Sequence, residues 1–233
     1  MVNRNIVIVK EARRLFSLPQ FDLTTFIVQL SVLLLAMPVH EFAHAAMAVR
    51  LGDDTPIKQG RYTLDPLSHL SLIGSLALFL FGFGWAKPVA VSNRAFKHPR
   101  RDMALVALMG PVANILFALV LMIIYKFMFG LAPGVWRTQI NIIFSTAISL
   151  NLTLAAFNLL PIPPLDGSRI LDAALPARAS FFLARHEGAV TVILLVLMYT
   201  GVLTIPLTLL TNLLWDFLFF ATIPIDKIVG LLQ

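Results

Sequence analysis

The chain has 233 residues, of which 58% are hydrophobic and 13% are charged, whereas roughly a quarter of the residues of a soluble domain are charged. This composition excludes an ordinary soluble protein and indicates a polytopic membrane protein. The formal net charge is +6, but the basic residues lie in short loops beside apolar runs, as in the cytoplasmic loops of membrane proteins, so we expect no nucleic-acid partner. The absence of cysteine excludes disulfides and thiolate metal sites.

Long intervals without Asp, Glu, Lys or Arg indicate the membrane segments. A bilayer core about 30 Å thick is crossed by about 20 helical residues, and five intervals are long enough: 23–40, 66–86, 103–125, 138–165 and 188–215. We therefore predict an all-α polytopic membrane protein with about five to six membrane helices. We expect one integral-membrane domain over residues 1–233, with its core at about 22–175 and C-terminal membrane helices at about 188–225.

The elements expected in chain order differ in character. A helix that begins near Asp22 should end near Gly52, because glycine commonly follows the last helical turn. The polar stretch TPIKQGRYTLDPL that comes next suits a short interfacial hairpin, since it mixes β-branched and aromatic residues. A GLAPG turn joins the third and fourth apolar segments, and the C-terminal apolar region is interrupted at Gly201 and Pro206, which predicts two closely linked helices.

The sequence HEFAH at 40–44 places titratable residues at the end of an apolar run, where such residues are functional by default. His40 and His44 are four positions apart, so a helix presents both imidazoles to one ion. Glu41 lies beside His40 and can reach a metal-activated water without being a ligand, which is the HExxH pattern of zinc proteases. The alternative is a chance pair of histidines at a helix end.

A catalytic zinc needs a third protein ligand and an open position for water. The extended metzincin pattern is absent, because Met47 and Arg50 stand where it requires glycine and histidine. Among the acidic residues later in the chain, Asp166 stands out. It follows NLLPIPPL, whose prolines cannot continue a helix, and irregular backbone at membrane depth is tolerated only where it is buried or lines a cavity. The alternative is an ordinary loop aspartate beyond a helix end.

Three motifs in this order, HEFAH, GPVAN at 110–114 and NLLPIPPLDG at 158–167, resemble the site-2 protease family of intramembrane zinc metalloproteases. The stretches GRYTLDPLSH and FGFGWAKPV are also similar to the compact bacterial branch of that family, which lacks PDZ and CBS domains. The similarity extends over about residues 25–175. We therefore expect the fold and the chemistry of that branch.

The resemblance also implies roles for individual residues. It implies three ligands for one zinc ion per chain: His40, His44 and Asp166. Glu41 is implied as the general base, and Asn114 and Asn158 as supporting residues near the site. Apart from the resemblance, the two asparagines suit an interhelical contact and a helix cap. The remaining histidines are expected to be solvated: His69, His98 and His186.

The topology follows from the requirement that the ligands meet. If every apolar interval crossed the membrane, HEFAH and Asp166 would lie about 30 Å apart and could not share an ion. Residues 67–90 must therefore enter the membrane and return, in agreement with the small re-entrant β-hairpin or loop that the resemblance implies. The active-site side then carries eleven lysines and arginines against six on the other side. The positive-inside bias predicts that this side faces the cytoplasm, and the resemblance to the bacterial branch implies a bacterial cell membrane.

These features predict hydrolysis of a peptide bond in or near a transmembrane helix of a membrane-protein substrate, with zinc activating water and Glu41 as its base. Gly82, Phe83 and Gly84 are expected to form an extended edge that pairs with the unwound substrate. The alternative is that the glycines only permit a tight turn. Two other functions stay open, a membrane zinc hydrolase of a non-peptide substrate and a catalytically inactive scaffold, and the oligomeric state is not indicated.

Overall fold

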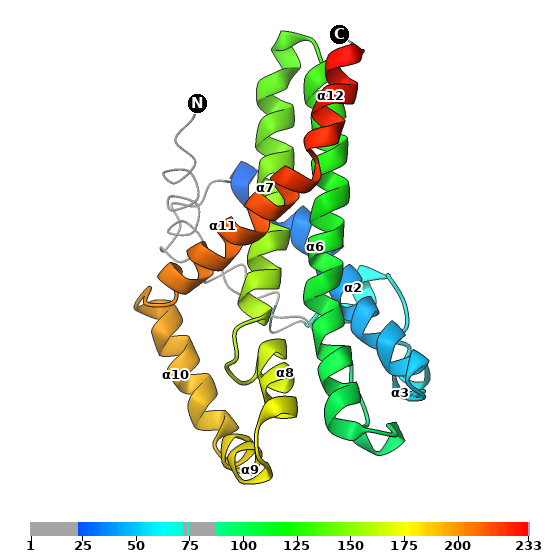
Figure 1. Cartoon of the computed structure of the whole chain (residues 1–233), viewed down its shortest axis with the longest axis vertical. Coiled ribbons are helices and arrows are strands. Elements are labelled where there is room, and N and C mark those ends of the chain that lie inside the picture. Colours follow the sequence, from blue (N-terminus) through cyan, green and yellow to red (C-terminus); the bar gives the residue numbers. More distant parts are fainter. Residues whose placement is uncertain (1–22, 72–73, 75–86, 233) are drawn as a thin grey trace.

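The protein is built almost entirely of helices (Figure 1). The computed structural model describes residues 23–71, 74 and 87–232. Within these residues there is no strand, and only Leu70 occupies an isolated bridge position. The predicted helical architecture is therefore confirmed for the described part of the chain.

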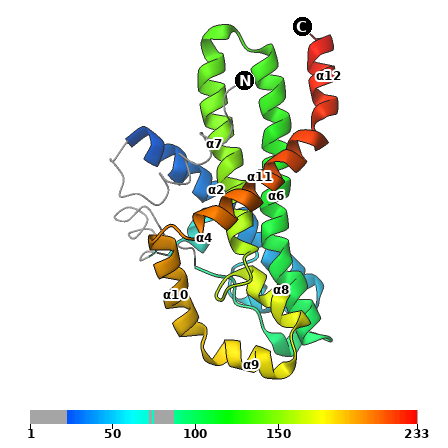
Figure 2. The ribbon, with the colours of Figure 1, turned by 60° about the vertical axis from the view of Figure 1, so that its left-hand side comes forward.

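Two long antiparallel helices form the axis of the molecule. α6 (Pro99–Leu131) runs from one end to the other, and α7 (Gly134–Asn158) returns beside it (Figures 1 and 2). The predicted turn between them is confirmed, since only Ala132 and Pro133 separate the two helices. Buried apolar side chains from α6, α7 and the later helix α11 (Thr204–Ala221) pack together at their interface: Ala118, Met122, Ile148, Leu152 and Leu218.

α2 (Leu23–Arg50) packs against both helices of this pair and runs in the same direction as α7 (Figure 1). Towards its C-terminus, Ala48 packs with Val106 and Phe96 in a small buried cluster. Gly52 follows the helix with φ +102°, a backbone conformation that favours glycine, so the predicted end of the helix is confirmed.

The interfacial hairpin predicted over TPIKQGRYTLDPL is wrong. The structure has two single-turn helices there, α3 (Thr55–Lys58) and α4 (Pro66–His69). Each has a proline in its first turn, where the missing N–H costs nothing and the fixed φ suits a helix. The Asp65 carboxylate caps α4 by accepting a hydrogen bond from Leu67 N at 3.0 Å. These helix-start signals outweigh the β-branched and aromatic composition.

Most of the segment expected to form the re-entrant hairpin lies outside the described residues, and Gly82, Phe83 and Gly84 are among those not described. The two described ends of this segment meet. Lys87 N donates a hydrogen bond to the carbonyl oxygen of His69 at 2.7 Å. The chain therefore departs from α4 and returns beside it.

Five helices follow α7. They are α8 (Asp166–Ala174), α9 (Ala177–Arg185), α10 (Glu187–Tyr199), α11 and α12 (Ile223–Leu231). α11 crosses α7, and α12 lies beside the upper part of α6 (Figures 1 and 2). The predicted break at Gly201 is confirmed, with φ +75°. Pro206 lies in the first turn of α11 and makes no break, because proline is tolerated there.

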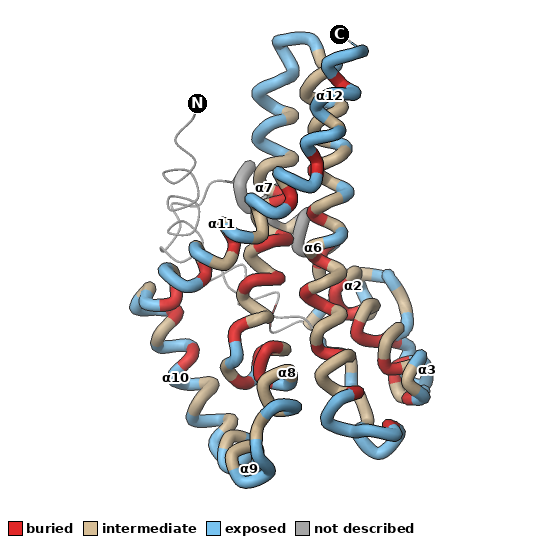
Figure 3. Tube along the Cα trace, in the orientation of Figure 1, coloured by how far each residue is buried: buried red, intermediate tan, exposed pale blue. Residues whose placement is uncertain are grey.

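Three described helices, α6, α7 and α11, are long and apolar enough to cross a membrane. The bent pair α9 and α10, which meet at 69°, makes a fourth if it forms one span. The outer faces of these helices expose many large apolar side chains, and buried residues concentrate where helices meet (Figure 3). This distribution is that of a membrane protein whose helices contact lipid.

Candidate metal centre

Three side chains from distant parts of the chain converge where α2 meets α8. His40 Nε2 and His44 Nε2 lie 3.0 Å apart, and Asp166 Oδ2 lies 3.2 Å from the first and 3.3 Å from the second. α2 presents both imidazoles on one face because they are one turn apart. Asp166 is the first residue of α8. The structure thus brings together the three residues expected to be ligands.

The three ligand atoms fit one small metal ion. Tetrahedral ligands of zinc, each about 2.0–2.1 Å from the ion, lie about 3.3 Å from one another, and the separations here are 3.0, 3.2 and 3.3 Å. His40 and His44 are only 4% and 8% exposed. Asp166 Oδ2 is buried and, apart from the two imidazole nitrogens, has no hydrogen-bond partner among the described residues, as suits an oxygen that binds a cation. Two nitrogen ligands and one oxygen ligand are a set that zinc accepts.

One hydrogen bond determines which ring nitrogen of His44 carries a proton. His44 Nδ1 lies 2.8 Å from the carbonyl oxygen of Val106 on α6. A carbonyl oxygen only accepts, so Nδ1 is the protonated donor. The lone pair of His44 Nε2 is then available to a metal.

Gly110 allows α6 to pass close to both imidazoles. A Cβ built on Gly110 would lie 2.6 Å from His40 Cε1 and closer still to His44 Nε2, so any side chain here would displace the ligands. The sequence connected GPVAN with the site only through the resemblance. In the sequence itself, the glycine inside an apolar helix indicates that another group packs closely against the helix backbone.

The stretch after α7 directs Asp166 back towards α2. α7 ends at Asn158, and the prolines that follow cannot extend it. Gly167 lets the first turn of α8 lie against the end of α7, because a Cβ there would clash with the carbonyl oxygens of Leu159 and Leu160. The dipeptide of Asp166 and Gly167 therefore combines a candidate ligand with the close helix contact that positions it.

Glu41 is buried beside the candidate ligands, with 8% of its surface exposed. Its Oε2 accepts a hydrogen bond from the main-chain amide of Val89 at 3.1 Å. Val89 belongs to the segment Lys87–Ser92, which follows α4 and precedes α6 in the sequence. One carboxylate oxygen is thus held by the backbone, and Oε1 is not engaged by this bond.

Asp53 fixes the other end of the segment Lys87–Ser92. Its Oδ2 accepts a hydrogen bond from Ser92 N at 2.7 Å, and its Oδ1 accepts from Thr55 N at 3.0 Å and from Thr55 Oγ1 at 2.5 Å. Burial by itself raises the pKa of Asp53, but these hydrogen bonds favour the charged form and lower the pKa below its ordinary value. Nothing in the local sequence pattern marked Asp53 or Val89 as part of the site's support.

The two asparagines implied by the resemblance, Asn114 and Asn158, lie on α6 and α7. Asn114 is fully buried one turn beyond Gly110, and neither polar atom of its side chain has a hydrogen-bond partner among the residues described. Asn158 is the last residue of α7, and its side-chain amide donates to the carbonyl oxygen of Leu154 at 2.9 Å. Asn151 is a further buried asparagine, on α7, that the sequence analysis did not single out.

The remaining histidines divide into two classes. His98 and His186 are exposed, as expected. The expectation that His69 is solvated is wrong, because it is only 1% exposed. α4 turns its ring inward, where Nε2 lies 2.8 Å from the carbonyl oxygen of Thr63 and donates to it. His69 therefore has a structural partner of its own and is not part of the metal cluster.

Comparison with known proteins gives a consistent result. Residues 133–201, which contain Asp166, match the model for peptidase family M50. "Putative zinc metalloprotease YwhC" of Bacillus subtilis is 39% identical over 171 residues, which cover 72% of this chain and 78% of that protein. "Putative zinc metalloprotease Rip2" of Mycobacterium tuberculosis is 33% identical over 177 residues, covering 74% of this chain and 66% of that protein.

An archaeal protein is similar as well. "Putative zinc metalloprotease MJ0611" of Methanocaldococcus jannaschii is 30% identical over 160 residues, which cover 67% of this chain and 75% of that protein. No solved structure matches the chain. The chain is therefore related to these proteins by sequence similarity alone.

Proposed function

Because the chain belongs to peptidase family M50, the site-2 proteases, we propose that it is an intramembrane zinc endopeptidase that cleaves a peptide bond in or near a transmembrane helix. The observation that carries this proposal is the convergence of two histidines, an aspartate and a buried glutamate beside α6, a helix apolar enough to cross a membrane. Ionisable groups in such surroundings are expensive unless they serve a function.

In this proposal His40, His44 and Asp166 hold one zinc ion per chain. The ion supplies Lewis-acid activation of water and of the scissile carbonyl. The bond from His44 Nδ1 to the Val106 carbonyl fixes one ring. The carboxylate of Asp166 adds a negative charge that strengthens binding of a dication, and α8 holds it in place.

Glu41 acts as the general base. It accepts a proton from the attacking water and passes it to the leaving amine. The hydrogen bond from Val89 N to Oε2 holds the carboxylate in one orientation, which supports proton transfer through Oε1. Burial beside the ligands keeps bulk water from competing for this group.

The substrate is a membrane protein whose helix unwinds locally before cleavage, since helical carbonyls are occupied by their own hydrogen bonds. Gly82, Phe83 and Gly84 would pair with the unwound strand by strand addition. The hydrogen bond from Lys87 N to the carbonyl oxygen of His69 brings the two ends of that segment together. Asn114 and Asn158 would support the site from α6 and α7.

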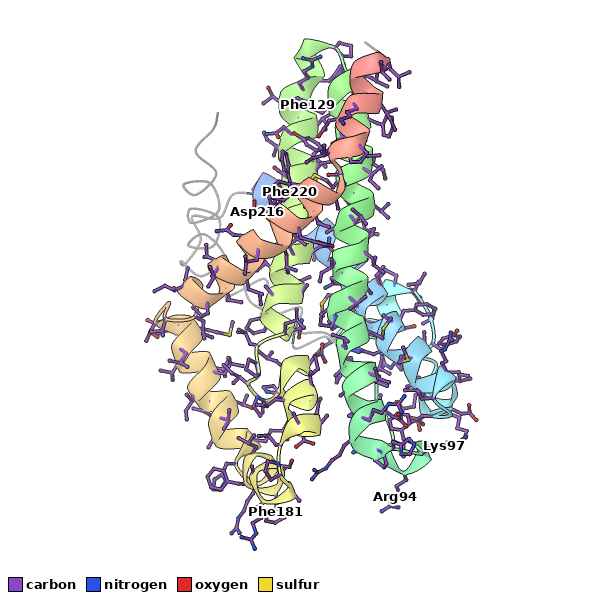
Figure 4. All side chains as sticks on the ribbon, viewed as in Figure 1. Arg94, Lys97, Phe129, Phe181, Asp216 and Phe220 are labelled. Atoms are coloured by element: carbon purple, nitrogen blue, oxygen red, sulfur yellow. The ribbon has the colours of Figure 1, made fainter. Side chains whose placement is uncertain are left out.

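The chain acts as a single integral-membrane domain of the bacterial cell membrane, with the site towards the cytoplasm. Basic residues gather at the end of the molecule where α6 begins and α9 lies, and Arg94 and Lys97 extend outwards there (Figure 4). Phe129 lies near the opposite end of α6 (Figure 4). An excess of Lys and Arg on one side favours the cytoplasm for that side.

Membrane proteomics of cells that carry the wild-type chain or Glu41→Gln tests the proposal. We expect fragments with new termini inside transmembrane segments in wild-type membranes, and intact precursors in the Glu41→Gln membranes. Identical fragment sets would contradict proteolysis. A Glu41→Gln effect confined to lipids or small amides would indicate a hydrolase of non-peptide substrates.

A further inference from the structure

His40 needs a hydrogen-bond acceptor for its second ring nitrogen when the first binds a metal. Its Nε2 faces His44 Nε2 and Asp166. A metal bound there takes the Nε2 lone pair, so the proton of the neutral ring must reside on Nδ1. His40 Nδ1 is buried and has no hydrogen-bond partner within the part of the chain that the structure describes. His44, by contrast, has the Val106 carbonyl for the same purpose.

Two buried asparagines lack partners in the same region. Asn114 on α6 and Asn151 on α7 are both 0% exposed. Within the described residues, Asn114 Oδ1 and Nδ2 have no hydrogen-bond partner, and neither has Asn151 Oδ1. Asn151 Nδ2 donates to the carbonyl oxygen of Ala147 at 2.9 Å. Leaving a buried polar atom unpaired is costly, and the large majority of buried polar side-chain atoms have a hydrogen-bond partner. The unpaired atoms here therefore require an explanation.

The packing of α2 and α6 places Asn114 near His40. Gly110 lies against the His40 ring, and Asn114 follows Gly110 by one turn on the same face of α6. The next turn brings Ala118, which packs with Leu152 of α7. Asn114 therefore lies in the layer between the metal ligands and the apolar core.

The packing of α2 and α7 places Asn151 in the same layer. Ala36 of α2 packs in one cluster with Ala147 of α7. His40 follows Ala36 by one turn, Asn151 follows Ala147 by one turn, and the two helices run in the same direction (Figure 1). Asn151 precedes Leu152, which belongs to the same buried cluster as Ala118. Three elements thus direct polar groups into one buried layer.

We propose that Asn114 and Asn151 are positioning residues for the metal centre, whose amide oxygens accept the Nδ1 proton of His40 directly or across one shared buried water. The inference rests on the proposed zinc site. An outer partner of this kind fixes the tautomer and orientation of a ligating imidazole, and its removal typically weakens metal affinity about 10–100-fold. Neither residue touches the metal or the substrate in this role.

The test compares zinc affinity, measured by competition with a chelator, in purified wild-type protein and in Asn114→Leu and Asn151→Leu. Leucine branches at Cγ as asparagine does, and it removes the acceptor. We expect at least one variant to bind zinc about tenfold or more weakly. Leu152→Ala is the matched control, because it disturbs packing in the same layer without removing an amide. It should bind zinc as the wild type does.

A rescue variant separates positioning from packing. Asn114→Asp keeps an oxygen acceptor opposite His40 and should bind zinc at least as well as the wild type, since carboxylate–histidine–zinc arrangements are common. Equal weakening in Asn114→Asp and Asn114→Leu would overturn the assignment of Asn114. Wild-type affinity in both leucine variants would overturn the whole inference, whereas wild-type protein that binds no zinc would overturn the proposed function itself.

The proton NMR spectrum of the cobalt(II)-loaded protein reads the histidines one by one. Each ligating imidazole has one exchangeable N–H, which the metal shifts out of the main spectrum. The His44 signal, bonded to Val106, is the internal reference and should be unchanged in all variants. The His40 signal should shift or exchange faster in the leucine variants. If both signals are unchanged in Asn114→Leu and Asn151→Leu, the inference is wrong.

Discussion

At the scale of single residues, Gly110 decides how closely α6 approaches the candidate ligands. Gly110→Ala should reduce zinc affinity at least about tenfold, because the new Cβ would lie 2.6 Å from His40 Cε1. The helix itself should not suffer, since alanine is the better helix former by about 1 kcal/mol. Gly230→Ala in α12, where a Cβ meets nothing within 4 Å, is the matched control. Unchanged zinc affinity in Gly110→Ala would show that the imidazoles can move aside.

A second residue-scale prediction separates the base from a ligand. Glu41→Gln should keep its zinc and lose cleavage about 100-fold or more, because the amide keeps the shape but cannot accept a proton. Asp166→Asn should lose zinc as well as activity, because it removes a charged ligand. Elemental analysis and cleavage of a reporter membrane protein measure the two properties. Near wild-type turnover by Glu41→Gln would exclude its role as base.

At the scale of elements, Asp53 holds the segment Lys87–Ser92 that carries the hydrogen bond to Glu41. Asp53→Ala should raise hydrogen exchange at Ser92 about tenfold or more at neutral pH, because it removes charge-assisted hydrogen bonds. The folded pKa of Asp53 lies below the ordinary 3.8. The stabilisation is therefore complete above about pH 4 and is lost as the pH falls through the lower folded pKa.

Exchange measured against pH checks this prediction. After correction for intrinsic exchange rates, wild type and Asp53→Ala should differ from neutral pH down to about pH 4 and converge at lower pH. Peptides from α11, far from Asp53, provide the control and should exchange alike in both proteins. A difference that persists unchanged at strongly acidic pH would mean that the side chain acts through packing.

The elements themselves were predictable where local signals agree with tertiary packing. Gly52 ends α2, and the GLAPG turn joins α6 and α7, because glycine and proline act through the backbone alone. The hairpin predicted over residues 55–67 was wrong because β-branched residues favour strands only on average. Here Thr55-Pro56 and Asp65-Pro66 begin helices instead.

The candidate site was only partly predictable for a related reason. His40, His44 and Glu41 share one helical turn, so their proximity follows from spacing. Asp166 could be singled out from its proline-rich context and the resemblance. The bond from Val89 to Glu41 and the position of Asn151 depend on how separate helices pack, and no local pattern encodes that.

At the scale of the whole molecule, the lack of cysteine makes the proposed orientation testable. Asn93→Cys and Gly134→Cys each introduce the single thiol of the chain at an exposed position, near opposite ends of α6. In intact cells a membrane-impermeant thiol reagent should label Gly134→Cys and leave Asn93→Cys unlabelled until the membrane is opened. The reverse pattern would invert the orientation, and labelling of both in intact cells would mean that α6 does not cross.

The placement of the candidate ligands has a consequence for how long the protein survives. His40 and Asp166 are more than a hundred residues apart in the sequence, so an ion bound to both works as a removable cross-link across a very large loop. In the chain-entropy description, a covalent link around about 100 residues stabilises a protein by about 4.7 kcal/mol, and a metal link acts in the same sense. A metal-starved cell would then hold an inactive enzyme that is also easier to unfold and degrade, so its abundance would follow the zinc supply.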